Sequence, residues 1–136
     1  MPINVECLPD EPIIIASFVE PIDYREESPW MFQRFVEIRD TDLEGYSRYY
    51  TIIDTNGVKV GFSDMVFIMG ESRIARQQRR EDRPVTLVLV GSGGLMELAS
   101  KAAGQRQYGS YSMRLFTSLE DALESIRAEL DEMPAV

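Results

Sequence analysis

The chain has few groups that could carry out chemistry, because none of its 136 residues is a histidine. Histidine is the usual base for serine and cysteine nucleophiles and the commonest protein ligand of metal ions. The only cysteine, Cys7, can form neither an internal disulfide nor a thiolate metal cluster. An enzyme would need a carboxylate such as Asp54 or Asp64 as its base, and no pair of carboxylates has a spacing that favours this. We therefore predict no catalytic residue, no metal site and no cofactor.

A candidate surface for binding a partner begins at Ser63 and Asp64, where the sequence changes from a loop to a helical pattern. At 100° per residue, methionines and arginines of MVFIMGESRIARQQ gather on one face, away from Phe67 and Ile68. Adaptable methionines suit a protein partner, whereas the arginines also fit a solvated face neutralised by nearby carboxylates. The predicted partner-binding residues are Ser63, Asp64, Met65, Met69, Arg73 and Arg76.

A second candidate site includes the glycine-rich turn GSGG, residues 91–94, between an apolar run and a helical pattern. Free backbone N–H groups at such a turn can bind an anion. The turn lacks the spacing of a dinucleotide-binding loop and the lysine of a P-loop, so tight turning also explains it. Because open α/β sheets bind ligands at the carboxyl ends of their strands, the alternative ligand-binding residues are Asp54, Ser63, Ser92 and Gly93.

Alternating strand and helix patterns must position these residues. The most informative is Val85 to Val90, an apolar run without a polar face, which is typical of a central parallel strand covered on both sides. Further strands are predicted at residues 13–19, 48–54 and 112–116, and helices at 29–44, 63–78, 95–103 and 117–130. Val58 to Phe62 could add another strand, but an extended connection into the next helix is preferred.

Short local signals mark where the helices begin. Ser28 and Pro29 have the residue types of an N-cap and a first helical position. Thr117 and Glu120 have the spacing of a capping box at the start of the last helix. Trp30, the only tryptophan, is expected to anchor the first helix in the core, with stacking on a ligand as the alternative.

This order of elements predicts a single layered α/β domain over residues 1–136. Its sheet is expected to be mainly parallel with four strands, or five if Val58 to Phe62 contributes. The order of strands within the sheet is left open. Residues 1–11 and 133–136 are expected to be loose termini.

The charge of the chain restricts its partners. A net charge of −9 and a pI near 4.5 repel phosphate backbones, which argues against nucleic acid. No apolar run approaches the ~20 residues that span a bilayer, and the first residues lack the features of a signal peptide. We therefore expect a cytoplasmic protein without membrane insertion.

The chain from about Tyr49 to Leu130 resembles the STAS family of anti-sigma-factor antagonists and their SpoIIAA-like relatives. Three segments carry the resemblance: YYTIIDTNGVKVGFSDMVFIMG, VTLVLVGSGGLMELASKAAG and MRLFTSLEDAL. The helix around Trp30 departs from the paired N-terminal strands of the antagonists and is more similar to helix-containing relatives. The resemblance implies a bacterial, SpoIIAA-like, non-enzymatic regulatory module that binds a partner protein or associates with itself as a dimer.

In that family a serine after an aspartate at the start of this helix is phosphorylated, and the added charge releases the partner. In this chain Asp64 aligns with the aspartate and Met65 stands where the serine would be. The resemblance therefore implies an interaction module without the usual phosphoserine switch. Ser63 is an alternative phosphate acceptor, or a plain helix N-cap.

Two binding functions follow from these observations. An interaction module predicts an exposed apolar patch that contains Met65 and Met69. A protein that binds a small anionic or lipid-like molecule predicts a concave pocket lined by Asp54, Ser63 and Ser92. We expect the interaction module and keep the small-molecule site as the alternative.

Overall fold

The computed structural model describes residues 3–56, 58, 60–61, 63–64, 66–68, 70–71, 85–91, 94 and 112–132. These residues build one five-stranded sheet in the order β1-β2-β3-β4-β5. The strands are β1 (Ile3–Cys7), β2 (Ile13–Phe18), β3 (Tyr49–Asp54), β4 (Val85–Val90) and β5 (Ser112–Phe116). Strands β2 to β5 agree with the sequence prediction, because β2, β3 and β4 are rich in β-branched or aromatic residues and β5 is a short segment that ends just before a helix start.

The sheet is mixed, which corrects the expectation of a mainly parallel sheet of four strands. Strand β1 pairs antiparallel with β2, whereas the neighbours from β2 to β5 all pair in parallel. Strand β1 lies within residues 1–11, so the prediction of a loose N-terminus is wrong. Its alternation is short but real, because Ile3 is buried and Asn4 and Glu6 are exposed. The fifth strand therefore comes from the N-terminal segment, and the described residues 58, 60 and 61 are not in a strand.

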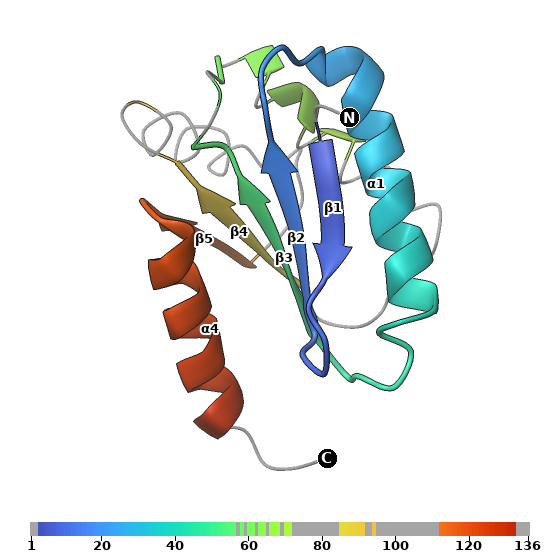
Figure 1. The fold of residues 1–136 in the computed structure, drawn as a ribbon, viewed down its shortest axis with the longest axis vertical. Coiled ribbons are helices and arrows are strands. Elements are labelled where there is room, and N and C mark those ends of the chain that lie inside the picture. The colour runs from blue at the N-terminus through green and yellow to red at the C-terminus, as the bar shows by residue number, and fades with distance from the viewer. Residues whose placement is uncertain are drawn as a thin grey trace.

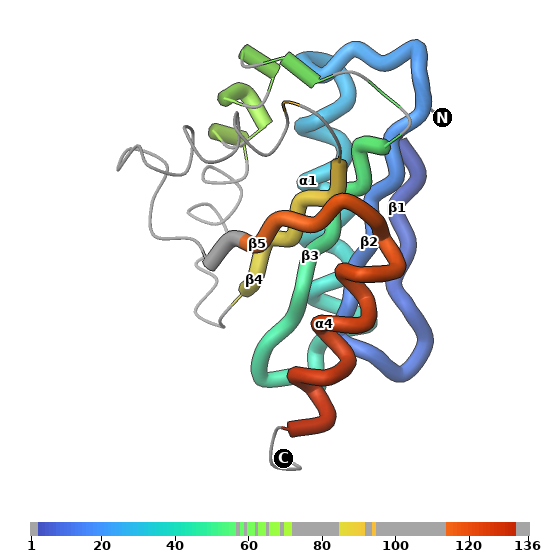
Figure 2. Tube along the Cα trace, turned by 90° about the vertical axis from the view of Figure 1, so that its left-hand side faces the viewer, coloured from blue at the N-terminus to red at the C-terminus, as the bar shows by residue number. Residues whose placement is uncertain are grey.

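Two helices cover opposite faces of the sheet (Figures 1 and 2). Helix α1 (Tyr24–Asp40) packs on the face that carries Ile14 and Leu89, and helix α4 (Leu119–Glu132) packs on the face that carries Ile15 and Val88. Successive side chains of a strand point to opposite faces, so each run of buried residues supplies both cores. This is why the continuous apolar sequence of β4 is needed.

Helix α1 begins five residues earlier than the sequence predicts. Asp23 is its N-cap, and the Oδ1 atom of Asp23 accepts the backbone N–H groups of Arg25 at 3.0 Å and Glu26 at 3.3 Å. Pro29 lies inside the helix, and Ser28 is fully buried instead of capping. The earlier start adds more than one turn and buries the ring of Tyr24, and burial of apolar surface outweighs a local capping signal.

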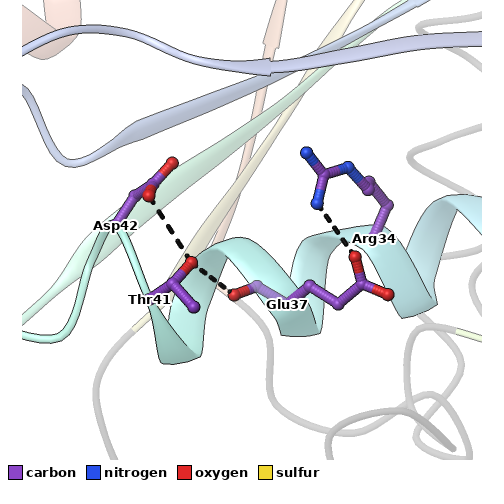
Figure 3. Close-up of polar contacts among 4 residues, drawn as sticks. All are labelled: Arg34, Glu37, Thr41 and Asp42. Carbon is purple, nitrogen blue, oxygen red and sulfur yellow. Dashed lines mark hydrogen bonds and ion pairs between the residues drawn. The ribbon is translucent and has the colours of Figure 1, made fainter.

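Helix α1 ends at Asp40, four residues before the predicted end (Figure 3). The hydroxyl of Thr41 donates to the carbonyl of Glu37 at 2.8 Å, which satisfies one of the free carbonyls of the last turn. The side chain of Glu37 accepts from Nη1 of Arg34 at 2.9 Å. The predicted end at Glu44 is wrong because the backbone turns at residues 41–45.

Trp30 does not anchor the core, because 37% of its surface is exposed. Its neighbours Met31, Phe32 and Phe35 are buried in the core that α1 forms with the sheet. The rings of Phe32 and Phe35 meet edge to face with centroids 5.4 Å apart. The prediction that Trp30 anchors the first helix in the core was therefore wrong.

Helix α4 is capped by Ser118 rather than by Thr117. The Oγ atom of Ser118 accepts the N–H of Asp121 at 3.1 Å, and its carbonyl accepts the N–H of Ala122 at 3.2 Å. The capping pair is therefore one residue later than the predicted Thr117 and Glu120. The buried face of the helix, which includes Ala122 and Ile126, agrees with the predicted spacing.

Candidate functional site

The carboxyl ends of β2, β3 and β4 lie at the same edge of the sheet, at the top of Figure 1. The loop after β2, the turn after β3 and the helical residues between 63 and 71 all lie at this edge. Parallel pairing brings these segments together although they are far apart in the sequence. This edge is therefore where the predicted binding residues have to be assessed.

Ser63 and Asp64 begin a helical segment at this edge. Ser63 is exposed, and the Oδ2 atom of Asp64 accepts the backbone N–H of Gly61 at 3.1 Å. A carboxylate that accepts the N–H of the preceding turn fixes the angle at which the chain enters the helix. Asp64 thus has a structural role that holds Ser63 at the surface.

The same helical segment is attached to the α1 side of the sheet. Ile68 is buried in the core that α1 covers, and it is 2% exposed. The guanidinium carbon of Arg25, in the first turn of α1, lies 5.1 Å from the centre of the Phe67 ring, within the range of a cation–π contact. The segment is therefore held by its buried side, and Ser63 is presented on a fixed support.

Negative charge gathers beside this support. Burial, followed by the charges of Asp64 and Glu20, raises the pKa of Tyr24 to about 12. Glu20 and Tyr24 also line an open depression together with Pro21 and Ile22. Because the two carboxylates both disfavour a further negative charge at Tyr24, this place suits a cationic group better than an anion.

Asp54 lies on the other face of the sheet. It pairs in register with Ser17 and Val90, and Val90 belongs to the core under α4. Its Oδ1 atom accepts the N–H of Asn56 at 3.0 Å, which closes the turn after β3. Ser63 begins the segment whose Ile68 packs in the core under α1, so these two predicted ligand-binding residues belong to segments on different sides of the sheet.

The turn after β3 is tied to the neighbouring strands. The hydroxyl and the N–H of Thr55 both donate to the carbonyl of Val90 at 2.8 Å. The side-chain amide of Asn56 donates to the carbonyl of Thr117 at 3.1 Å. These bonds tie the turn after β3 to the end of β4 and to the residue just before the N-cap of α4.

Several predicted site residues lie outside the described part of the chain, so their predicted roles stay predictions. They are Met65, Met69, Arg73, Arg76, Ser92 and Gly93.

A polar cluster that the sequence did not predict lies at the opposite end of the sheet, on the face that α4 covers. Glu129 accepts the hydroxyl proton of Tyr50 at 2.9 Å, Nη2 of Arg48 at 3.3 Å and Nη1 of Arg114. The guanidinium carbons of the two arginines lie 5.9 and 6.0 Å from the centre of the Tyr50 ring. The members are up to 81 residues apart in the sequence, so no local pattern could reveal the cluster.

The cluster shifts the titration of its members. The hydrogen bond from Arg114 lowers the pKa of Glu129 despite partial burial, and the bond from Tyr50 adds to this effect. Burial, together with the bond to Glu129, raises the pKa of Tyr50 to about 12, although the two arginines oppose the rise. At neutral pH the cluster therefore contains two cations, one anion and a neutral phenol.

Within the described residues, no group of three or more cysteine, aspartate or glutamate side chains is arranged to hold a metal ion. In the same part of the chain, no helix is long and apolar enough to cross a membrane. No protein-family model, no curated protein and no solved structure matches the chain.

Proposed function

We propose that this protein is a non-enzymatic regulatory module that binds a partner protein at the carboxyl-end surface around Ser63 and Asp64. The resemblance to STAS anti-sigma-factor antagonists supports this proposal, as does the lack of histidine in the whole chain. The observation that carries it is the exposed Ser63 at the start of a helical segment that is fixed from its other side. A preorganised surface loses little conformational freedom on binding.

The charge at this surface indicates the chemistry of the partner. Glu20 and Asp64 lie near the neutral phenol of Tyr24, so the partner should present lysine or arginine side chains there. The predicted arginines Arg73 and Arg76 would add a separate contact of opposite sign. Complementary charge of this kind increases the rate of association and selects the partner.

The usual phosphoserine switch is not part of this proposal, because Met65 occupies the position of the acceptor serine. If Ser63 were phosphorylated instead, its ≈ −1.5 to −2 charge would add to those of Asp64 and Glu20. The added negative charge would strengthen the binding of a basic partner rather than weaken it. A phosphate on Ser63 would therefore act in the opposite sense to the release that the family uses.

Site-specific photo-crosslinking tests the proposal. A photoreactive phenylalanine replaces exposed Ser63 in one variant and exposed Glu44, at the opposite end of the sheet, in the control. Both variants are irradiated in lysate of the source cells, and the products are identified by mass spectrometry. We expect one specific protein product, or a dimer, from position 63 only. The same products from both positions would contradict the proposal.

The identified partner then allows a quantitative test. Ser63→Arg places a bulky cation in the centre of the surface and should weaken binding about tenfold, because it repels basic groups of the partner. Glu44→Arg makes a comparable change at the other end and should leave the dissociation constant within about twofold. Thermal melting of both variants confirms that the fold is retained.

Small-molecule binding is the second candidate, and the open depression beside Glu20 and Tyr24 favours it. Its charge favours a ligand with an amine group, unlike the anionic ligand that the glycine-rich turn suggested. A primary amine such as putrescine should raise the melting temperature of the wild-type protein and not that of Glu20→Gln. Equal shifts in both proteins, or a shift with acetate alone, would remove this candidate.

A further inference from the structure

Arg48 and Arg114 differ from the other ion-paired arginines of the described residues because they share one carboxylate. Arg127 has Glu11 to itself and binds it through two nitrogens, at 2.9 and 3.0 Å. Arg34 pairs with Glu37, and Arg39 with Asp40. Arg48 and Arg114 both form an ion pair with Glu129.

Sharing leaves an excess of positive charge and of hydrogen-bond donors. Each guanidinium group carries five N–H donors, whereas the two oxygens of Glu129 offer about four acceptor sites in all. Tyr50 is neutral and donates its own proton to the same carboxylate, so it uses acceptor capacity without supplying charge. Two cations and one anion leave a net charge of +1 in a protein whose total charge is −9.

The spare donors are accessible and held in position. The side chains of Arg48 and Arg114 are 38% and 31% exposed, whereas the Tyr50 ring that both guanidinium groups approach is fully buried. An aromatic face beside a guanidinium limits its orientations and leaves its N–H edges for hydrogen bonds. The bond from Arg48 to Glu129 is 3.3 Å long and shares Oε1 with the Tyr50 hydroxyl, so Arg48 is the less firmly held of the two.

We propose that Arg48 and Arg114 form a binding site for a phosphate group at the end of the sheet opposite the carboxyl-end surface. The phosphate accepts the guanidinium N–H groups that Glu129 leaves free, and Arg48 turns from Glu129 toward it. Phosphate fits better than a carboxylate because its additional oxygens can accept from two guanidinium groups at once. A phosphorylated small molecule and free phosphate present the same chemistry to this site, and the titrations below distinguish the two sources.

Titration of the whole protein with inorganic phosphate tests the site, followed by heteronuclear NMR at low ionic strength. Saturable shifts should appear at the side-chain signals of Arg48 and Arg114 and at the ring of Tyr50, and not at Arg34. This readout uses the wild-type protein and does not depend on whether a variant folds. Absence of a saturable shift at Arg48 and Arg114 would overturn the proposal, and equal affinity for acetate would overturn its assignment to phosphate.

Three variants sharpen the test. Arg48→Gln should reduce the phosphate affinity about tenfold, the effect of one charge-assisted hydrogen bond. Glu129→Gln removes the competing charge and should increase the affinity several-fold, by about the factor that a nearby unit charge gives at a partly exposed site. Arg34→Gln, an exposed arginine on α1, should leave the affinity unchanged. A similar loss in Arg48→Gln and Arg34→Gln would show only a general charge effect and would reject the site.

The source of the phosphate is distinguished by two further titrations. A phosphorylated small molecule such as phosphoserine should bind more tightly than inorganic phosphate if the natural ligand carries additional groups. Equal affinities would assign the site to free phosphate. Because the site lies away from Ser63, the Arg48→Gln variant should keep the crosslinking pattern of the wild-type protein, so this proposal and the proposed function fail independently.

Discussion

Tyr24 and Tyr50 lie at opposite ends of the sheet, and the pKa of each is raised to about 12 for different reasons. At Tyr24, burial and two nearby carboxylates, Asp64 and Glu20, all act in the same direction. At Tyr50, burial and the hydrogen bond to Glu129 raise the pKa, while Arg48 and Arg114 lower it. The two pKa shifts are similar in size, but their surroundings differ. The charges near Tyr24 are negative, whereas near Tyr50 the positive charges of two arginines oppose the effects of burial and Glu129.

This difference separates a surface suited to binding from a cluster that also stabilises the fold. The charges named among the causes of the Tyr24 shift are both negative, so this end of the sheet favours a basic group of a partner. The cluster around Tyr50 connects β3, β5 and α4. Helix α4 has no basic residue in its own last turn, so the arginines of the sheet also supply the positive charge that a helix C-terminus favours.

The largest expected effect is on the Tyr50 end. Glu129→Ala leaves the buried hydroxyl of Tyr50 without its acceptor and two guanidinium groups without their counter-ion, so the free energy of unfolding should fall by about 2–3 kcal/mol. Urea denaturation measures the change. Glu132→Ala, on the exposed side of the same helix, is the control and should change it by no more than about 0.5 kcal/mol. Equal effects would show that the cluster contributes nothing specific.

A smaller effect is expected when only the hydroxyl is removed. Tyr50→Phe keeps the buried ring and loses one hydrogen bond to a charged group, so it should lower the free energy of unfolding by about 1.5 kcal/mol. Urea denaturation at pH 7 measures it. In the double variant with Glu129→Ala the two losses should not add, because they remove the same bond. If the losses of the two single variants add in the double variant, Tyr50 and Glu129 do not form the hydrogen bond described above.

The next effect tests how the Tyr24 end is built. Asp23→Ala removes the N-cap of α1 and should lower the free energy of unfolding by about 1 kcal/mol. Ser28→Ala should cost less or even stabilise the protein, because the buried Ser28 hydroxyl has no hydrogen-bond partner. A larger loss of stability in Ser28→Ala than in Asp23→Ala would contradict the N-cap at Asp23 and would support the helix start that the sequence predicts at Ser28 and Pro29.

The smallest expected effect is the change that salt makes to the pKa values of Tyr24 and Tyr50. It distinguishes the carboxylates near Tyr24 from the hydrogen-bonded cluster around Tyr50. Because both folded-state pKa values lie above the ordinary value of 10.0, their contribution to stability is complete below pH 10 and is lost as the pH rises toward about 12. High salt screens the carboxylates around Tyr24, so the pKa of Tyr24 should fall in 1 M salt more than that of Tyr50. Absorbance at 295 nm measures the ionisation of the tyrosines, and the variants Tyr24→Phe and Tyr50→Phe assign each transition to its residue. Equal salt effects would contradict the comparison.

Local pattern was sufficient for much of the fold. Strands β2 to β5 and the buried face of α4 follow from β-branched runs, turn residues and helical spacing, which act over a few residues. The same reasoning reached Ser63 as an exposed helix start. It could not assign β1, because five weakly alternating residues become a strand only when β2 offers its edge.

The sequence by itself therefore determined the alternation of strands and helices, the absence of histidine chemistry and the acidic charge of the molecule. Only the tertiary structure decided that α1 starts at Asp23, where burying a further turn outweighs the signal at Ser28 and Pro29. It also placed Asp54 and the segment of Ser63 on different sides of the sheet, and it brought Glu129 to Tyr50 across 79 residues. Such contacts depend on register and packing between distant segments, and these are set when the whole core forms.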